Sequence, residues 1–342
     1  MIRRDFWQAN ASSFAAFTAR FLLFIGFFGA LLPVVGQSVH LRHEGRDYID
    51  LATGGGRFGM NASWLSGREI FRLRSRWTAI DVGKGKKILY LNKVPIYLGF
   101  PTLYTDERLY MAEADYRHVL ESILTPQVFR NPPTLQKIVI DPGHGGGDSG
   151  ALNDAHGLKE KHLNLDVSKR LQRLLQSKGY EVVLTRNSDI FIPLERRTDI
   201  ANYEKADLFI SIHFNAAVNT QASGVETFIL TPQYQGSSKF TKPSSRDNVR
   251  FPGNDFDPWN TLTGFYFQRE LVRGIGGVSR GLKRARFHVL KHLNCPGVLV
   301  ELGFVSHRPT AQRLRSARHR EQLAKSLFDA VITYHQRLQR IP

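Results

Sequence analysis

The sequence predicts an α/β protein in which a domain with a mostly parallel sheet, flanked by helices, follows a small α+β module. From residue 137 onward, strand-like and helix-like segments alternate. Residues 45–130 instead contain short β-like runs bounded by turn residues. A stiff segment, Asn131-Pro132-Pro133-Thr134, separates the two blocks. We therefore expect a module at 45–130, a linker at 131–135 and a larger domain at 136–340.

The larger block has the pattern of repeated strand–helix units. Strands are expected at 137–141, 181–185, 207–213, 225–230 and 297–301. Helices are expected at 163–178, 194–205 and about 309–336. A polar segment, 232–260, interrupts the pattern, and loops of this length are usually functional or disordered. Pro243, Pro252 and Pro258 argue against a stable helix in this segment.

The smaller block is expected to hold several short strands and two short helices. The strands are predicted at 70–73, 78–82, 87–91 and 94–98, with a tight turn at Asn92-Lys93 between the last two. The helices are predicted at 48–58 and 112–122.

The composition indicates a globular chain and limits the kinds of metal site. Hydrophobic residues make up 42% of the 342 residues and charged residues 23%, which excludes a wholly disordered chain or a fibre. The only cysteine is Cys295, which excludes an intrachain disulfide framework and a Cys-based zinc finger. A metal site in this chain would have to use histidines and carboxylates.

Residues 1–36 have the layout of a targeting segment. Arg3, Arg4 and Arg20 precede an uncharged apolar run at 21–36, which is shorter than the roughly 20 residues of a spanning helix. The layout predicts a secretory signal peptide, and an uncleaved membrane anchor is the alternative. Both predictions place the rest of the chain outside the cytoplasm, in the periplasm or cell envelope. Contact with the membrane is expected only if the segment is uncleaved.

The net charge of +17 is concentrated near the C-terminus, since residues 263–342 hold 15 basic and 4 acidic side chains. Such a basic region suits nucleic acid, an anionic polymer or a membrane surface. A simple solvated face is the other interpretation. Because an exported protein does not meet nucleic acid, we expect no nucleic-acid partner.

Four residues near the ends of expected elements have the chemistry of a metal-dependent hydrolase. His144 and His213 follow or end two expected strands, Glu160 precedes the first expected helix, and Glu301 ends the last strand. The carboxyl ends of parallel strands meet at one edge of a sheet. Two histidines and one carboxylate form a catalytic zinc set, and a further glutamate can act as general base. From these residues alone, structural roles for the histidines and a salt bridge for Glu301 stay open.

Seven motifs in order resemble a known family. They are KIVIDPGHGG, GLKEKHLNL, RTDIAN, LFISIHFNA, SGVETFIL, SRGLKRARFHVL and CPGVLVELGFVS. Over residues 136–337 they resemble the zinc-dependent N-acetylmuramoyl-L-alanine amidases, which cleave peptidoglycan. The resemblance implies that His144, Glu160 and His213 bind Zn²⁺ and that Glu301 is the catalytic glutamate. It also implies peptidoglycan as partner and a substrate contact for Asn215, for which a structural role is the alternative.

Other positions of the resemblance concern the surroundings of the site. Arg197 and Asn202 match residues that support the fold around it, while His307 and Ser149 depart from the usual pattern. The segment 232–260 is longer than in simple family members. We expect a substrate-facing lid or a partner-binding loop there, with disorder as the alternative. The sequence does not indicate whether an activator protein acts on the chain.

The smaller block resembles a second family through YIDLAT, KILYLNKVPIYL and ERLYMAEADY. These segments are similar to the copper amine oxidase-type N-terminal module found on some wall enzymes. No copper ligand set is visible, so only the fold is implied. Gly54-Gly55-Gly56 departs from the pattern, because it falls where a helix is expected. Both a wall-targeting role and a passive spacer stay open.

Three alternative functions remain. The chain could be another zinc hydrolase acting on the same polymer, since ligands and fold do not fix the reaction. It could be a degenerate or regulatory peptidoglycan-binding protein. It could bind nucleic acid through the basic end, which the targeting segment opposes.

Overall fold

The computed structural model describes residues 40–239 and 244–342 of the chain. The expected signal segment, 1–36, lies outside the described residues. The described residues belong to one compact unit. Within the described part of the chain, no helix has the length and apolar character needed to cross a membrane.

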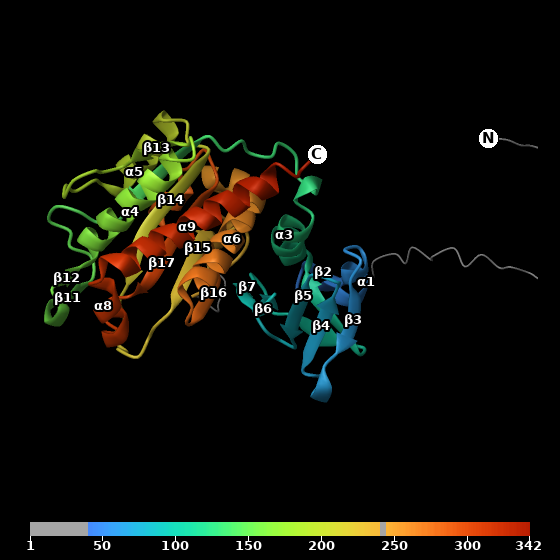
Figure 1. Cartoon of the computed structure of the whole chain (residues 1–342). Coiled ribbons are helices and arrows are strands. Elements are labelled where there is room, and N and C mark those ends of the chain that lie inside the picture. The colour runs from blue at the N-terminus through green and yellow to red at the C-terminus, as the bar shows by residue number, and fades with distance from the viewer. Residues whose placement is uncertain (1–39, 240–243) are drawn as a thin grey trace, which may run out of the picture. The chain divides into compact units, whose positions relative to one another are not determined.

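Residues 40–130, called the N-terminal module below, are mostly strands (Figure 1). The strands are β1 (His40–His43), β2 (Arg46–Asp50), β3 (Asn61–Trp64), β4 (Ile70–Arg74), β5 (Ala79–Gly83), β6 (Ile88–Leu91), β7 (Val94–Tyr97), β8 (Leu103–Thr105) and β9 (Arg108–Ala112). The helices are α1 (Leu51–Gly56), α2 (Glu113–Asp115) and α3 (Ser122–Leu124), with a π-helical turn η2 (Tyr116–Glu121) and 3₁₀ turns η1 (Ser66–Arg68) and η3 (Pro126–Val128).

The module is therefore β-rich, and the predicted start of one of its helices is wrong. The four expected strands occur as β4 to β7, and Asn92 and Lys93 both have positive φ, as a tight hairpin turn requires. The expected helix at 48–58 begins only after Asp50, because β2 pairs with both β1 and β9. Asp50 caps α1 by accepting a hydrogen bond from the Thr53 N–H at 3.0 Å.

The glycines of α1 are explained by close packing. A Cβ on Gly54 would lie 2.7 Å from the ring of Tyr116, and one on Gly55 would lie 2.6 Å from the side chain of Leu73. Helix α1 thus packs against its neighbours at a distance that a larger residue would prevent.

The larger domain contains the remaining elements. Its strands are β10 (Lys137–Pro142), β11 (Leu152–Asn153), β12 (Leu158–Lys159), β13 (Glu181–Leu184), β14 (Leu208–Asn215), β15 (Val225–Leu230), β16 (Ser279–Ala285) and β17 (Gly297–Phe304). Its helices are α4 (Glu160–Gln176), α5 (Leu194–Tyr203), α6 (Asp257–Ile275), α7 (His288–Lys291), α8 (Arg308–Leu314) and α9 (Ala317–Leu338), with 3₁₀ turns η4 (Asp154–His156), η5 (Ser245–Asn248) and η6 (Pro252–Phe256).

The main sheet is large and mixed, whereas the sequence predicts a mostly parallel one. Its order is β13-β10-β14-β17-β15-β16-β7-β6-β5-β4-β3. Strands β13, β10, β14 and β17 are parallel, but β15 is antiparallel to β17. The reason is that β15 follows β14 through the loop 216–224 without a crossover helix. Antiparallel strands β7 to β3 of the module then extend the sheet.

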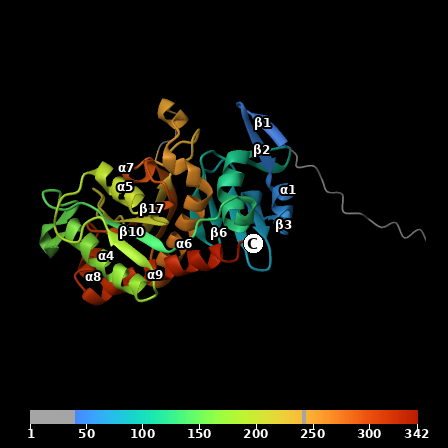
Figure 2. The ribbon, with the colours of Figure 1, turned by 90° about the horizontal axis from the view of Figure 1, so that it is seen from above.

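Helices cover both faces of the larger domain's sheet (Figure 2). Alternate residues of each strand point to opposite faces. Ile210 and Val300 belong to the core that includes the apolar residues of α4, α6 and α9. Phe209 and Leu299 belong to a second core that includes residues of α5 and α7. Strands β14 and β17 are thus buried on both faces.

Several elements of the C-terminal half differ from the expectation, including the short helix α7, which was not predicted. Helix α6 begins inside the segment expected to be a loop, because Pro258 lies in its first turn, where proline is favoured. Strand β16 is not predicted, since its basic side chains hide the apolar alternation. The single helix expected at 309–336 is two helices, α8 and α9, separated at Arg315-Ser316.

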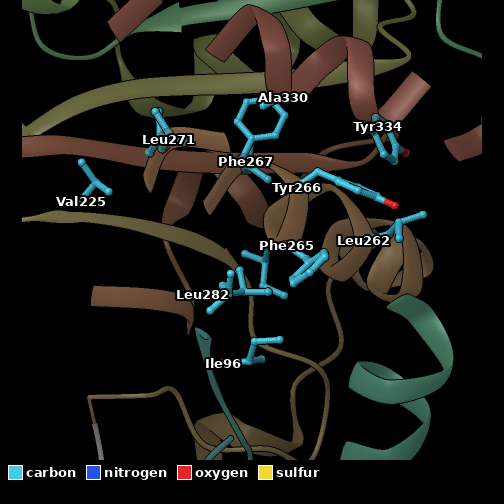
Figure 3. Close-up of a cluster of buried hydrophobic side chains, with 14 of the residues drawn as sticks. Ile96, Val225, Leu262, Phe265, Tyr266, Phe267, Leu271, Leu282, Ala330 and Tyr334 are labelled. Atoms are coloured by element: carbon cyan, nitrogen blue, oxygen red, sulfur yellow. The ribbon is translucent and has the colours of Figure 1, made fainter. Parts of the chain in front are cut away.

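The module joins the larger domain through strand pairing and a buried ion pair. Ile96 of β7 pairs with Leu282 of β16, and both side chains lie in the core with Phe265 of α6 (Figure 3). Arg284 Nη1 donates to Asp115 Oδ1 at 2.9 Å, and both residues are almost fully buried. Asp115 also accepts hydrogen bonds from the backbone N–H groups of the Gly99-Phe100 turn. One carboxylate therefore binds both the module's own turn and β16.

Replacing Arg284 with methionine should destabilise the protein strongly, because it leaves the Asp115 carboxylate buried without its cation. We expect a loss of about 3–5 kcal/mol in the free energy of unfolding, measured by urea denaturation. The control is Asp81→Asn, which breaks the partly exposed Arg72–Asp81 pair and should cost about 1 kcal/mol or less. Equal losses in the two variants would contradict the role assigned to the buried pair.

Candidate metal centre

Two histidines and one glutamate converge at the carboxyl edge of the sheet. One ligand atom from each of His144, Glu160 and His213 lies within 4.8 Å of the others. His144 Nε2 is 3.1 Å and His213 Nδ1 is 2.9 Å from the same oxygen, Glu160 Oε1. This donor set is the one that catalytic zinc sites use, so the residues fit a zinc ion.

The strands and helix α4 bring these three residues together. His144 follows β10 and His213 lies near the end of β14, and the two strands are parallel neighbours. Glu160 is the first residue of α4. His144 has φ of +61°, a left-handed conformation that is uncommon for residues other than glycine. Such backbone conformations concentrate at functional sites.

Two glycines make the convergence sterically possible. A Cβ on Gly143 would lie 2.2 Å from the ring of His213. A Cβ on Gly150 would lie 2.6 Å from both Glu160 Oε2 and the ring of His144. Larger residues at either position would push the candidate ligands apart.

Hydrogen bonds hold Glu160 as an anion. Burial by itself would raise its pKa, but hydrogen bonds from His144 and His213 outweigh burial and lower the pKa of Glu160 well below its ordinary value. The backbone N–H groups of Ala151 and Phe214 also donate to the carboxylate, at 2.8 and 3.1 Å. The site therefore presents an oriented, charged carboxylate.

A second carboxylate orients His144. Asp148 Oδ2 lies 2.8 Å from His144 Nδ1, the ring nitrogen that does not face Glu160. The Gly150 N–H donates to the other Asp148 oxygen at 3.0 Å. Carboxylate–histidine pairs of this kind fix the ring and its tautomer at metal sites. Sequence reasoning missed Asp148, although its spacing of four residues from His144 is a usable signal.

Two buried arginines support the loop that carries His144. Arg197 Nη2 donates to the His144 carbonyl at 3.0 Å, and its Nη1 donates to Asp141 Oδ1 at 2.7 Å. Arg186 Nη2 donates to the carbonyls of Gly143 and Lys161, both at 2.8 Å. The contacts of Arg197 agree with the expected supporting role. Arg186 was not predicted as a supporting residue, and its only signal in the sequence is its position after β13.

Asn202 supports the fold farther from the candidate ligands. Its side chain donates to the His292 carbonyl at 2.7 Å and accepts a hydrogen bond from the Asn294 N–H at 2.8 Å. It thus connects α5 to the segment between α7 and β17.

Glu301 lies beside the three candidate ligands on the neighbouring strand. In the strand register it is opposite His213 on one side and Glu226 on the other. Its Oε2 atom is buried and has no hydrogen-bond partner among the described residues. Burial first, and then the charges of Glu160 and Glu226, raise the pKa of Glu301 well above its ordinary value. This arrangement places a carboxyl group with raised proton affinity beside the three candidate ligands.

The side chain of Asn215 contacts Glu226. Its Nδ2 donates to Glu226 Oε1 at 2.7 Å. The other oxygen of this buried carboxylate accepts from Arg280 Nε at 3.0 Å and from Lys283 Nζ. Glu226, Arg280 and Lys283 were not predicted as part of the site. The motif SGVETFIL does not indicate that its glutamate contacts two distant cations.

The basic residues of the C-terminal region do not form one surface. Several of them are used in ion pairs, at Glu226, Asp115, Asp247 and Asp166. Arg313, Arg315 and Arg318, between α8 and the start of α9, are exposed. The expected basic patch is thus smaller than the charge count indicates.

The described part of 232–260 packs against β16. Arg286 donates to the Gln235 carbonyl at 2.7 Å and to Asp247 Oδ1 at 2.9 Å. The Arg284 N–H donates to Ser238 Oγ at 2.9 Å. A lid or partner-binding role for this segment stays a prediction.

Relatives share the region that carries these residues. N-acetylmuramoyl-L-alanine amidase LytC of Bacillus subtilis (strain 168) is 34% identical over 206 residues, which cover 60% of this chain and 37% of LytC. The amidase AmiA of Escherichia coli (strain K12) is 34% identical over 218 residues, which cover 58% of this chain and 75% of AmiA. The chain therefore spans little more than a third of LytC but three quarters of AmiA.

Structural comparison agrees with the sequence relatives. The crystal structure of N-acetylmuramoyl-L-alanine amidase from Clostridium difficile 630 is similar with a TM-score of 0.50 at 29% identity, covering 59% of this chain and 98% of that one. The family model described as N-acetylmuramoyl-L-alanine amidase matches residues 138–333, more than half of the chain. The match includes all five predicted site residues and begins after the N-terminal module. The chain belongs to the N-acetylmuramoyl-L-alanine amidase family.

Proposed function

We propose that this chain hydrolyses the amide bond between N-acetylmuramic acid and L-alanine in peptidoglycan, with zinc as its cofactor. The observation that carries the proposal is the convergence of His144, Glu160 and His213 next to Glu301, in a chain of this family. The two histidines and the ionised Glu160 would hold the metal. When bound, zinc supplies Lewis acidity, which polarises a carbonyl group and makes water a better nucleophile.

Glu301 is proposed as the general base and acid. Its unpartnered Oε2 would take a proton from the attacking water and return it to the amino group of the departing L-alanine. Asp148 and Arg197 would keep His144 in position during this step. Asn215, which is held by Glu226 at the edge of the site, is proposed to contact the substrate.

The proposed organisation follows the sequence blocks. Residues 136–340 form the catalytic domain, 131–135 a linker, 45–130 the module, and 1–36 a signal peptide or anchor. Export to the periplasm or cell envelope is proposed from the layout of residues 1–36.

The direct test is cleavage of purified peptidoglycan by the full-length chain, with and without a chelator. Free peptides beginning with L-alanine should appear only when metal is present, and mass spectrometry identifies them. Release of fragments cut within the peptide or the glycan, with the muramoyl–L-alanine link intact, would contradict the proposal and favour another hydrolase. Wall binding without any cleavage would favour a binding protein.

Replacing Glu301 with glutamine should lower kcat by about 10²- to 10⁴-fold, because the amide cannot accept the proton from water. Zinc content, measured by atomic emission, should stay the same, since Glu301 is not among the three candidate ligands. Glu107→Gln, in an exposed turn, is the matched control and should retain full activity. Cleavage by the Glu301 variant at the wild-type rate would eliminate the assigned role.

Replacing Asp148 with asparagine should weaken zinc binding by about 10- to 100-fold, because His144 loses the carboxylate that orients its ring. Competition with a zinc-chelating indicator measures the affinity. Asp106→Asn removes an exposed carboxylate of the module and should leave the affinity unchanged. Equal zinc affinities in both variants and the wild type would show that Asp148 does not support the site.

A further inference from the structure

A pocket lies where the N-terminal module meets the larger domain. It has a volume of about 270 Å³ and opens to solvent between β6, β7 and β16, which lie side by side in Figure 1. The residues that matter for its chemistry are Tyr90, Pro95 and Tyr97 from the module and Val278, Arg280 and Lys283 from the larger domain. The family match does not include the module, so this pocket combines a family region with an added one.

Strand register places this pocket in line with the candidate metal centre. His213, Glu301 and Glu226 stand opposite one another on β14, β17 and β15. Glu226 in turn stands opposite Gly281 on β16, and β16 pairs with β7. With neighbouring strands about 4.8 Å apart, β16 lies roughly 14 Å and β7 roughly 19 Å from β14. An extended peptide of about five or six residues, at ~3.3 Å per residue, reaches from β14 to the pocket between β16 and β7.

A bulge turns Arg280 toward the same face as Glu226, which Lys283 already shares in regular register. The register between β15 and β16 shifts after Val225, so Arg280 has no partner on β15. Bulges of this kind redirect a side chain. Arg280 Nε and Lys283 Nζ both donate to Glu226 Oε2. Two cations thus face one anion, which leaves one positive charge in surplus at the pocket.

Arg280 remains accessible to a ligand. Its side chain is 35% exposed although Nε is used by Glu226. A guanidinium carries five N–H donors and suits a carboxylate. The guanidinium carbon lies 4.9 Å from the centroid of the Phe304 ring, and Lys283 Nζ lies 5.5 Å from that of Tyr97. These ring contacts hold both cations in place.

The module is fixed well enough to contribute to such a site. Gly281 has φ of +89°, and a Cβ there would lie 2.6 Å from the Pro95 carbonyl oxygen. Only glycine therefore lets β16 approach β7 this closely. The buried Arg284–Asp115 pair holds the same two parts together. Tyr90 and Tyr97 are thus set beside Arg280 and Lys283 before any substrate binds.

We propose that this pocket binds a carboxylate of the peptide that extends from the scissile amide, so that the module forms part of the substrate site. The inference rests on the proposed amidase function. The peptide is the proposed occupant because its carboxylates complement the surplus positive charge of the pocket. Tyr90, whose side chain is half exposed, supplies an apolar surface for the peptide beside the cations.

The test compares two soluble muramoyl-peptides of identical sequence, one with free carboxylates and one with every carboxylate converted to a carboxamide. The full-length wild type, Arg280→Gln and the control Arg74→Gln are assayed for kcat/KM on both substrates. Arg74 is an exposed arginine of β4, outside the pocket. Because general damage lowers both values alike, the ratio of the two isolates the carboxylate contact.

The wild type and the Arg74 variant should prefer the free-carboxylate substrate by about tenfold or more. In Arg280→Gln, the ratio of kcat/KM for the free-carboxylate substrate to kcat/KM for the carboxamide substrate should fall close to one. A wild-type ratio near one, or an unchanged ratio in Arg280→Gln, overturns the carboxylate pocket while leaving amidase activity in place. Cleavage of neither substrate by the wild type overturns the amidase proposal and this inference together.

A second variant tests whether the module contributes to binding of the peptide substrate. Tyr90→Ala should raise KM several-fold for the full peptide substrate and leave kcat unchanged. KM for a substrate that ends at L-alanine should not change, because that substrate does not reach β6. Equal KM values for wild type and variant on the full peptide would overturn the assignment of the module to the substrate site.

Discussion

The buried carboxylate of Asp141 is the interaction on which the candidate site depends. Its Oδ1 accepts hydrogen bonds from Arg197 Nη1 at 2.7 Å and Thr185 Oγ1 at 2.6 Å, and its Oδ2 accepts from Ser211 Oγ at 2.8 Å. These donors come from α5, from the end of β13 and from β14, so one side chain connects three elements around β10. The same Arg197 holds the carbonyl of His144. A buried charge is tolerated only when it is fully paired, and here the pairing fixes the edge at which His144 and His213 meet.

The sheet has a comparable role on a larger scale. Its register puts His213, Glu301 and Glu226 side by side, and continues through β16 into the strands of the module. An added module that only lay beside a catalytic domain would not affect its chemistry. This one shares a sheet, a core and a buried ion pair with the larger domain. The candidate metal centre and the pocket proposed to hold the peptide therefore lie on one continuous sheet.

Many of the strands and helices could be predicted from the local sequence pattern. Strands such as β10 and β14 are apolar runs bounded by turn residues, and α4 and α9 have regular apolar faces, so their positions follow from periodicity. The failures have physical causes. The strand β16 carries Arg280, Lys283 and Arg284, whose partners are distant in sequence, so its pattern resembles an exposed basic segment. The start of α6 was not predicted, because Pro258 in the sequence argues against a helix. Proline breaks a helix in its interior but is accommodated in the first turn, where Pro258 lies.

The sequence by itself determined the chemistry that is available: two histidines and two glutamates near element ends, within motifs that hold their order over more than half of the chain. It determined this because strand ends and helix starts depend on local residue choice. Only the tertiary structure decided which groups lie next to them. The position of Glu226 beside Glu301 and the contact of Asp115 with Arg284 are relations of strand register and buried charge. Register and burial depend on how distant segments pack, and a single sequence carries no local mark of them.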